Sequence, residues 1–201
     1  MFVFEVSTQS KMILKSETMS KFVIRFFSFI LIILISITGF SQSTQPAPSA
    51  PSNFTSKLIG MGVVVADMEK SLDFYVNAIG MVKAYSFTIN EDFSKRSGLS
   101  NGVPAAVTVL KLESSPEANE WKLMSFGKKA THPKQNFIQD DVGVQYITIN
   151  VKALKPIIER LKQRNVPFLG SSPTQLNRNS QLLFVQDPDG TFIELIGPMG
   201  D

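Results

Sequence analysis

LLFVQDPDGTFIELIGP, residues 182–198, places two runs of β-forming residues on either side of the sequence Asp-Pro-Asp-Gly. Pro188 fixes φ at a value that suits a turn, and Gly190 can adopt the positive φ that closes it. The stretch therefore predicts a tight β-hairpin.

Side chains in the second strand of this hairpin alternate between the two faces of the sheet. Phe192, Glu194 and Ile196 share one face, while Ile193 and Leu195 share the other. The Glu194 carboxylate thus lies among apolar neighbours, and its burial would require a metal, a cation or a ligand as a partner. The alternative is an edge strand whose glutamate is in solvent.

The composition limits the classes of protein to which the chain can belong. Its 201 residues suffice for one domain with a substantial core or for two small modules. The absence of cysteine excludes disulfides, thiolate metal sites and a cysteine nucleophile. Most of the net charge of +3 comes from the first 41 residues. The nearly neutral remainder has no basic run, which argues against nucleic-acid binding.

The beginning of the chain has the pattern of a secretory signal. Lys21 and Arg25 precede an apolar run, Phe26 to Thr38, which is followed by small residues. A transmembrane helix needs about 20 apolar residues, and this run is shorter.

We therefore expect residues 1–41 to be a signal peptide, or else a membrane anchor over residues 22–40 if it is not cleaved. Either way, the positive charges stay inside and the rest of the chain is exported to the periplasm or the extracellular space. Residues 42–57 are a Pro/Ser-rich linker that is too polar to pack.

The first half of the remaining chain reads as strand, helix and three strands. Asp67 can cap the helix, Gly80 can end it, and an apolar face recurs at spacings of three and four residues. The face consists of Leu72, Tyr75, Val76 and Ile79, and the predicted strands are 58–65, 81–89, 105–112 and 121–126.

The second half repeats this plan. The helix, Leu154 to Arg164, buries Ile157, Ile158 and Leu161 and can end at a left-handed Asn165. The predicted strands are 144–151, 166–169 and the two strands of the hairpin. The repeat predicts an α+β fold with two tandem βαβββ modules, at about 58–127 and 142–197, within one domain of residues 58–197.

Several of these motifs carry a family resemblance. Val65-Ala66-Asp67, Ser71, Phe74-Tyr75 and Ile79-Gly80, with the hairpin and Glu194, resemble the vicinal oxygen chelate superfamily of glyoxalases, bleomycin-resistance proteins and extradiol dioxygenases. The resemblance implies that the two modules form a curved mixed sheet with a cup. It also implies four metal-ligand positions, which Gly60, Lys122, Tyr146 and Glu194 occupy here.

This set of side chains is a poor one for a metal. Glycine offers no donor atom, an ammonium group repels a divalent cation, and zinc, nickel and iron favour several imidazole and carboxylate ligands. We therefore expect no metal and no cofactor. Lys122, Tyr146 and Glu194 become candidate ligand-binding residues, and we expect Lys122 and Glu194 to face each other across the cup.

Two functions from different classes remain open. The first is an exported protein that resembles the bleomycin-resistance branch and binds a small organic molecule in the cup, as a monomer or homodimer. The second is a lyase, isomerase or dioxygenase that uses a displaced metal or acid–base chemistry of the three side chains. Whether the protein is an enzyme stays open at this point.

Two further segments have a functional and an ordinary interpretation. The long polar stretch 90–104 is either a lid or a mobile surface loop. His132, the only histidine, lies in a polar linker, where such a residue is more often solvated than catalytic.

Overall fold

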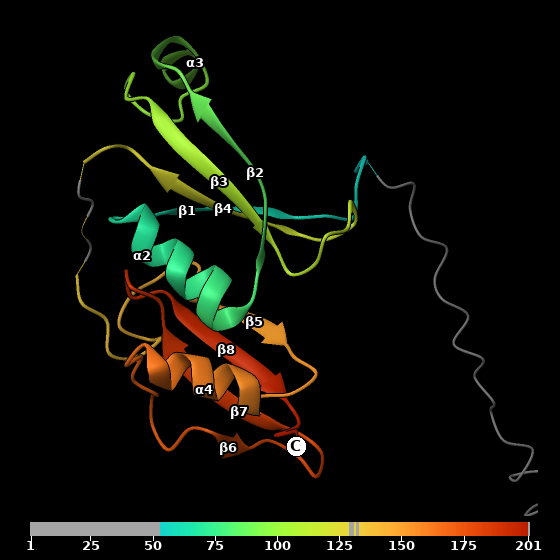
Figure 1. Ribbon diagram of the computed structural model, residues 1–201. Helices are drawn as coiled ribbons and strands as arrows, with labels where there is room; N and C mark the ends of the chain where they lie inside the picture. Colours follow the sequence, from blue (N-terminus) through green and yellow to red (C-terminus); the bar gives the residue numbers. More distant parts are fainter. Residues whose placement is uncertain (1–52, 129–130, 132, 201) are drawn as a thin grey trace, which may run out of the picture. The chain divides into compact units, whose positions relative to one another are not determined.

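The computed structural model describes residues 53–128, 131 and 133–200 (Figure 1). The expected leader, residues 42–52 of the expected linker and His132 lie outside the described residues. Residues 54–201 form one compact unit by their contacts. No helix within the described part of the chain has the length and hydrophobicity needed to cross a membrane.

The tandem βαβββ plan is confirmed. The first module contains β1 (Gly60–Val64), α2 (Met68–Leu72), η1 (Asp73–Ile79), β2 (Val82–Ile89), α3 (Glu91–Arg96), β3 (Ala105–Lys111) and β4 (Glu120–Ser125). The second contains β5 (Tyr146–Asn150), α4 (Lys155–Gln163), β6 (Thr174–Gln175), β7 (Gln181–Gln186) and β8 (Phe192–Gly197). Their four-stranded mixed sheets have the orders β1-β4-β3-β2 and β5-β8-β7-β6.

The predicted hairpin forms between β7 and β8, which pair in antiparallel orientation. Its turn closes through hydrogen bonds from the N–H of Gly190 to the carbonyl of Asp187 (3.1 Å) and from the N–H of Asp187 to the carbonyl of Thr191 (2.9 Å). Gly190 has a φ of 96°. β8 is flanked by β5 and β7, so Glu194 lies on an inner strand and the edge-strand alternative is wrong.

The first helix begins as predicted and then changes its form. Asp67 caps it by accepting the N–H groups of Glu69 and Lys70 (both 3.1 Å). From Asp73 onward the helix is a π-helix, and left-handed Gly80 ends it. The helix buries Phe74 and Ala78 in addition to Tyr75 and Ile79, whereas the predicted face contained only the last two of these four residues.

Two predicted segments differ from the structure. The stretch 90–104 contains helix α3, because Asn90 accepts the N–H of Phe93 (2.8 Å) and acidic and basic residues occupy its first and last turns. Residues 166–169 form no strand and make only an isolated bridge, from Phe168 to Val185. The edge strand of the second sheet is β6 instead.

One hydrophobic core joins the two modules. It gathers the helix-facing sides of both sheets, such as Trp121 and Leu123 in one and Ile193 and Leu195 in the other. In Figure 1, α2 and α4 lie on the same side of the strands. The opposite side of each sheet carries no helix and is called the helix-free face below.

The motifs that indicated the family meet where the modules join. The buried Tyr75 hydroxyl donates to Asp187 Oδ2 (2.7 Å). Asp189 Oδ1 accepts the N–H of Ala66 (3.2 Å), and Asp189 Oδ2 accepts the Ser71 hydroxyl (3.4 Å). The hairpin of the second module thus anchors the first helix, which accounts physically for the presence of both motifs in one chain.

Candidate functional site

The strand register places the four family positions equivalently in the two modules. In the first, β1 and β4 pair Gly60 with Glu120 and Gly62 with Lys122; in the second, β5 and β8 pair Tyr146 with Phe192 and Thr148 with Glu194. Lys122 and Glu194 therefore occupy the same register position. Both side chains lie on helix-free faces, because Trp121, Leu123, Ile193 and Leu195 beside them point into the core.

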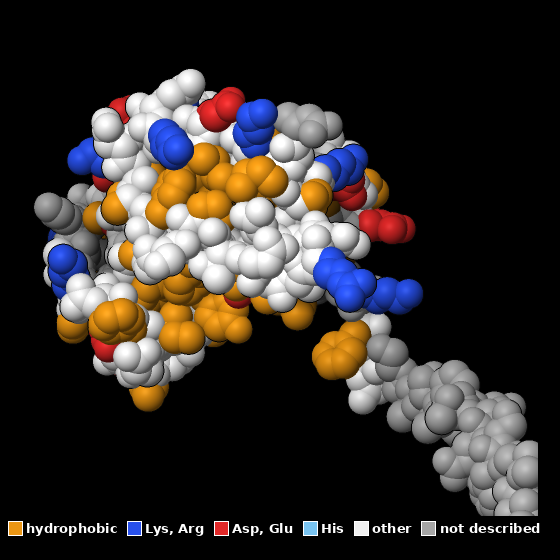
Figure 2. Space-filling model, turned by 90° about the horizontal axis from the view of Figure 1, so that it is seen from below, with side chains coloured by type: hydrophobic (Ala, Val, Ile, Leu, Met, Phe, Trp, Pro, Cys, Tyr) orange, Lys and Arg blue, Asp and Glu red, His pale blue; other side chains and the backbone are white. Residues whose placement is uncertain are grey.

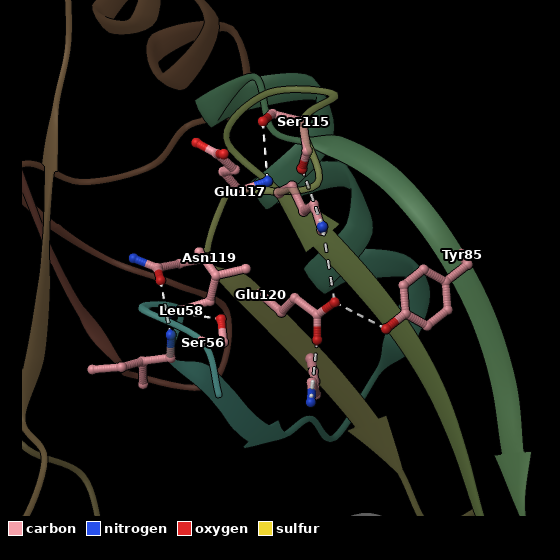
Figure 3. A network of polar contacts seen from close by, with 10 residues as sticks. Ser56, Leu58, Tyr85, Ser115, Glu117, Asn119 and Glu120 are labelled. Carbon is pink, nitrogen blue, oxygen red and sulfur yellow. Dashed lines mark hydrogen bonds and ion pairs between the residues drawn. The ribbon is translucent and has the colours of Figure 1, made fainter. Parts of the chain in front are cut away.

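Lys122 is engaged within its own module (Figure 3). Its Nζ lies 3.2 Å from Glu120 Oε2, two residues away on the same strand. The amine also lies over Gly60, where a Cβ atom would be 2.8 Å from Nζ. Among the described residues the ion-pair partner of Lys122 is Glu120, and that Lys122 and Glu194 face each other across the cup stays a prediction.

Glu120 is the centre of this network. Its Oε1 accepts the Tyr85 hydroxyl (3.0 Å) and lies 3.9 Å from Lys111 Nζ. The hydrogen bond from Tyr85, assisted by Lys122 and Lys111, lowers the pKa of Glu120, and the same bond raises the pKa of Tyr85. A carboxylate held in its ionised form by these partners is a poor proton acceptor near neutral pH.

Glu194 has a different environment. It is half-buried on β8, and among the described residues its one hydrogen bond comes from the Thr148 hydroxyl on β5 to Oε2. No described lysine or arginine pairs with it. The described residues therefore offer this carboxylate a hydroxyl but no cation.

A cavity of about 500 Å³ lies beside Glu194. Its lining comes from three parts of the second half of the chain, namely the connecting segment 136–139, the segment 169–174, and strands β7 and β8. The lining residues are Asn136, Phe137, Ile138, Gln139, Leu169, Gly170, Ser171, Ser172, Thr174, Leu182, Phe184 and Glu194. Glu194 is the single charged side chain in this set.

Three hydrogen bonds hold the segment that closes one side of this cavity. Asp140 Oδ2 accepts the N–H groups of Asn136 (2.8 Å) and Phe137 (3.0 Å). Gln186 Nε2 on β7 donates to the carbonyl of Gln135 (3.1 Å). These contacts fold residues 135–140 against the hairpin.

Tyr146 does not line the cavity, but it packs against Phe184, which does. Its ring lies edge-on to Phe184, with ring centroids 6.5 Å apart. Phe184 in turn stacks on the buried Phe192 at 5.4 Å. The structure thus brings Tyr146 and Glu194 together on the helix-free face of the second sheet, while Lys122 belongs to the Glu120 network of the first.

The residues at the four family positions do not fit a transition metal. One carboxylate and one exposed phenol are the only oxygen donors, and the Lys122 ammonium stands at the third position beside a glycine at the fourth. Within the described residues, no group of three or more histidine, cysteine, aspartate or glutamate side chains is placed to hold a metal ion.

The sequence analysis did not find the segment 136–139 or the Glu120 network. Phe137 and Ile138 are two adjacent apolar residues in an otherwise polar connection, and this was the available indication that the connection packs on something. On the face of the molecule that Figure 2 shows, hydrophobic side chains gather in the middle and charged side chains lie mostly toward the edge.

Comparison with known proteins gave a family and a fold. Residues 57–195 match the Glyoxalase/Bleomycin resistance protein/Dioxygenase superfamily. No curated protein sequence matches the chain.

Among solved structures, a glyoxalase family protein from Bacillus cereus is 15% identical with a TM-score of 0.60, over 76% of this chain and 99% of that one. The trypanothione-dependent glyoxalase I of Leishmania major is 18% identical with a TM-score of 0.51, over 71% and 87%. Glyoxalase I from Zea mays is 17% identical with a TM-score of 0.52, over 72% of this chain and 45% of that one. At these identities the likeness shows the fold alone.

Proposed function

The chain belongs to the Glyoxalase/Bleomycin resistance protein/Dioxygenase superfamily, and on that premise we propose that it binds a small organic molecule in the cavity beside Glu194. Binding requires no metal at the family positions. The observation that carries the proposal is a half-buried carboxylate in the wall of a largely apolar cavity, with no charged partner among the residues that the structure describes.

The size and lining of the cavity support this proposal. Ligand sites in proteins are commonly clefts of about 300–1,000 Å³ with apolar walls and a few polar groups that orient the ligand. Here Phe137, Phe184 and Leu182 supply apolar surface, and Glu194 and Thr174 supply polar groups. Of the three cavities described along the chain, this one has the largest volume.

The alternative of an acid–base enzyme receives less support. It would require Lys122, Tyr146 and Glu194 to act at one centre. Lys122 is paired with Glu120 instead, and its amine occupies the space that a side chain at Gly60 would fill. A reaction at Glu194 would therefore proceed without the Lys122 amine as one of its acid–base groups.

We also propose that the protein acts outside the cytoplasm. The support is the order of basic residues, apolar run and small residues at the start of the chain. A binding protein of this kind would take up or sequester a molecule in the periplasm or the extracellular space.

The test of binding uses N-phenyl-1-naphthylamine, a neutral apolar dye whose fluorescence rises when it leaves water. We expect a saturable increase with the wild-type protein. Leu182→Trp fills the cavity and should abolish the increase, while its matched control Leu112→Trp, at an exposed leucine outside the cavity lining, should retain it. Equal binding by both variants, with both folded by circular dichroism, would refute the proposed site.

A further inference from the structure

We propose that this cavity selects organic cations, that is, ligands with an ammonium group attached to a flat apolar body. The inference rests on the proposed function, since it names the class of molecule that the same cavity takes. Three features of the described residues carry it: the charge of the lining, the lack of a described cationic partner for Glu194, and the two aromatic rings in the lining.

The described lining of the cavity carries one charge, and it is negative. Besides Glu194, its polar lining consists of neutral side chains: Asn136, Gln139, Ser171, Ser172 and Thr174. The segment at its rim continues into Asp140 and Asp141. In a cavity with apolar walls a single carboxylate is screened weakly, so it attracts a cation and repels an anion.

The two modules of this chain treat their carboxylates in opposite ways. On the helix-free face of the first sheet, Glu120 has Lys122 at 3.2 Å, Lys111 at 3.9 Å and the Tyr85 hydroxyl at 3.0 Å. On the helix-free face of the second, the Thr148 hydroxyl is the sole described partner of Glu194 and occupies only Oε2. The first module supplies its own ammonium groups, whereas in the second no described residue donates to Oε1 of Glu194, which lines the cavity.

Two aromatic rings in the lining of the cavity suit a flat apolar body. Phe184 lies directly opposite Glu194 in the sheet and is held by stacking on Phe192. Phe137, with 62% of its surface exposed, lies in the segment that closes the cavity. An aromatic ligand can lie against these rings, and its cationic nitrogen can reach the carboxylate and the ring faces together.

Three probes of nearly equal shape test the selection by charge: 1-naphthylmethylamine, 1-naphthalenemethanol and 1-naphthoate, titrated by calorimetry at pH 7 into the full protein without its leader. We expect the amine to bind about tenfold or more tightly than the alcohol, because a charged hydrogen-bonded pair replaces a neutral contact. The carboxylate should bind most weakly of the three.

Glu194→Gln then assigns the selection to one side chain. This variant keeps the shape of Glu194 and should bind the alcohol as the wild type does while losing the preference for the amine. Glu159→Gln removes the same charge from the exposed face of α4 and should leave the preference unchanged.

The outcomes separate this inference from the proposed function. If all three probes bind wild type equally, or the amine preference persists in Glu194→Gln, the selection of cations is refuted and binding in the cavity stands. If none of the three binds and the neutral dye also fails, the proposed function falls and the inference falls with it.

Discussion

The hydrogen bond between Tyr75 and Asp187 joins the two modules, and Tyr75→Phe removes it with little change of shape. Tyr75 is fully buried and Asp187 has 5% of its surface exposed. Their oxygens are 2.7 Å apart. Loss of the hydroxyl leaves Oδ2 of a buried carboxylate without this donor, while Oδ1 keeps the N–H groups of Asp189 (2.9 Å) and Thr191 (2.8 Å).

The expected cost follows from that geometry. A buried hydrogen bond to a charged group contributes about 1.5–3 kcal/mol, and the two remaining backbone donors limit the loss to about 2 kcal/mol. For a folded unit of this size, each kcal/mol lowers the melting temperature by roughly 2–4 °C. We therefore expect Tyr75→Phe to lower the melting temperature by about 4–8 °C.

Urea unfolding followed by circular dichroism measures this cost, and Tyr85→Phe is the matched control. Tyr85 also donates to a carboxylate, Glu120, but its side chain is exposed, so the same change should cost about 0.5 kcal/mol or less. A double-mutant cycle with Asp187→Asn should show a coupling of at least about 1 kcal/mol. If Tyr75→Phe costs no more than Tyr85→Phe, the hydrogen bond does not hold the modules together.

Three further predictions concern other parts of the chain. Burial raises the pKa of Asp187 in the folded protein above its value in the unfolded chain. Wild type should therefore become more stable relative to Asp187→Asn as the pH falls through the folded-state pKa, and this gain should be complete below the unfolded-state pKa. A difference in unfolding free energy between the two proteins that is constant from pH 3 to 8 would contradict this. Gly60→Ala should displace the Lys122 amine from Glu120 and raise the pKa of Glu120, and an unchanged carboxyl titration by NMR would argue against it. Amino-terminal sequencing of the exported protein should find a start near Gln42, whereas a full-length cytoplasmic product would count against the leader.

Local chemistry made much of the fold predictable. The Pro188–Gly190 turn, the Asp67 cap and left-handed Asn165 depend on residues within a few positions of each other, and the structure has all three where the sequence places them. The π-helix η1 and helix α3 were not predicted. In η1 the side chains of Phe74 and Ala78 pack into the core that the two modules share, and the π-form winding is a feature that the apolar pattern did not indicate.

The candidate site divides in a similar way. Residue identity alone shows that glycine, lysine, tyrosine and glutamate are a poor set of metal ligands. It does not show which partner a lysine takes. Lys122 reaches Glu120 because alternate residues of one strand share a face, and this nearby carboxylate is available without bridging the two sheets.

The sequence by itself determined the two βαβββ modules and the hairpin that carries Glu194, because period-two alternation, caps and turns act between neighbouring residues. The tertiary structure alone decided that Tyr75 meets Asp187, 112 positions away, and that residues 136–139 close a cavity over Glu194. Those contacts depend on where separate elements come to rest. Core packing and loop closure set that arrangement, and neither leaves a regular pattern along the chain.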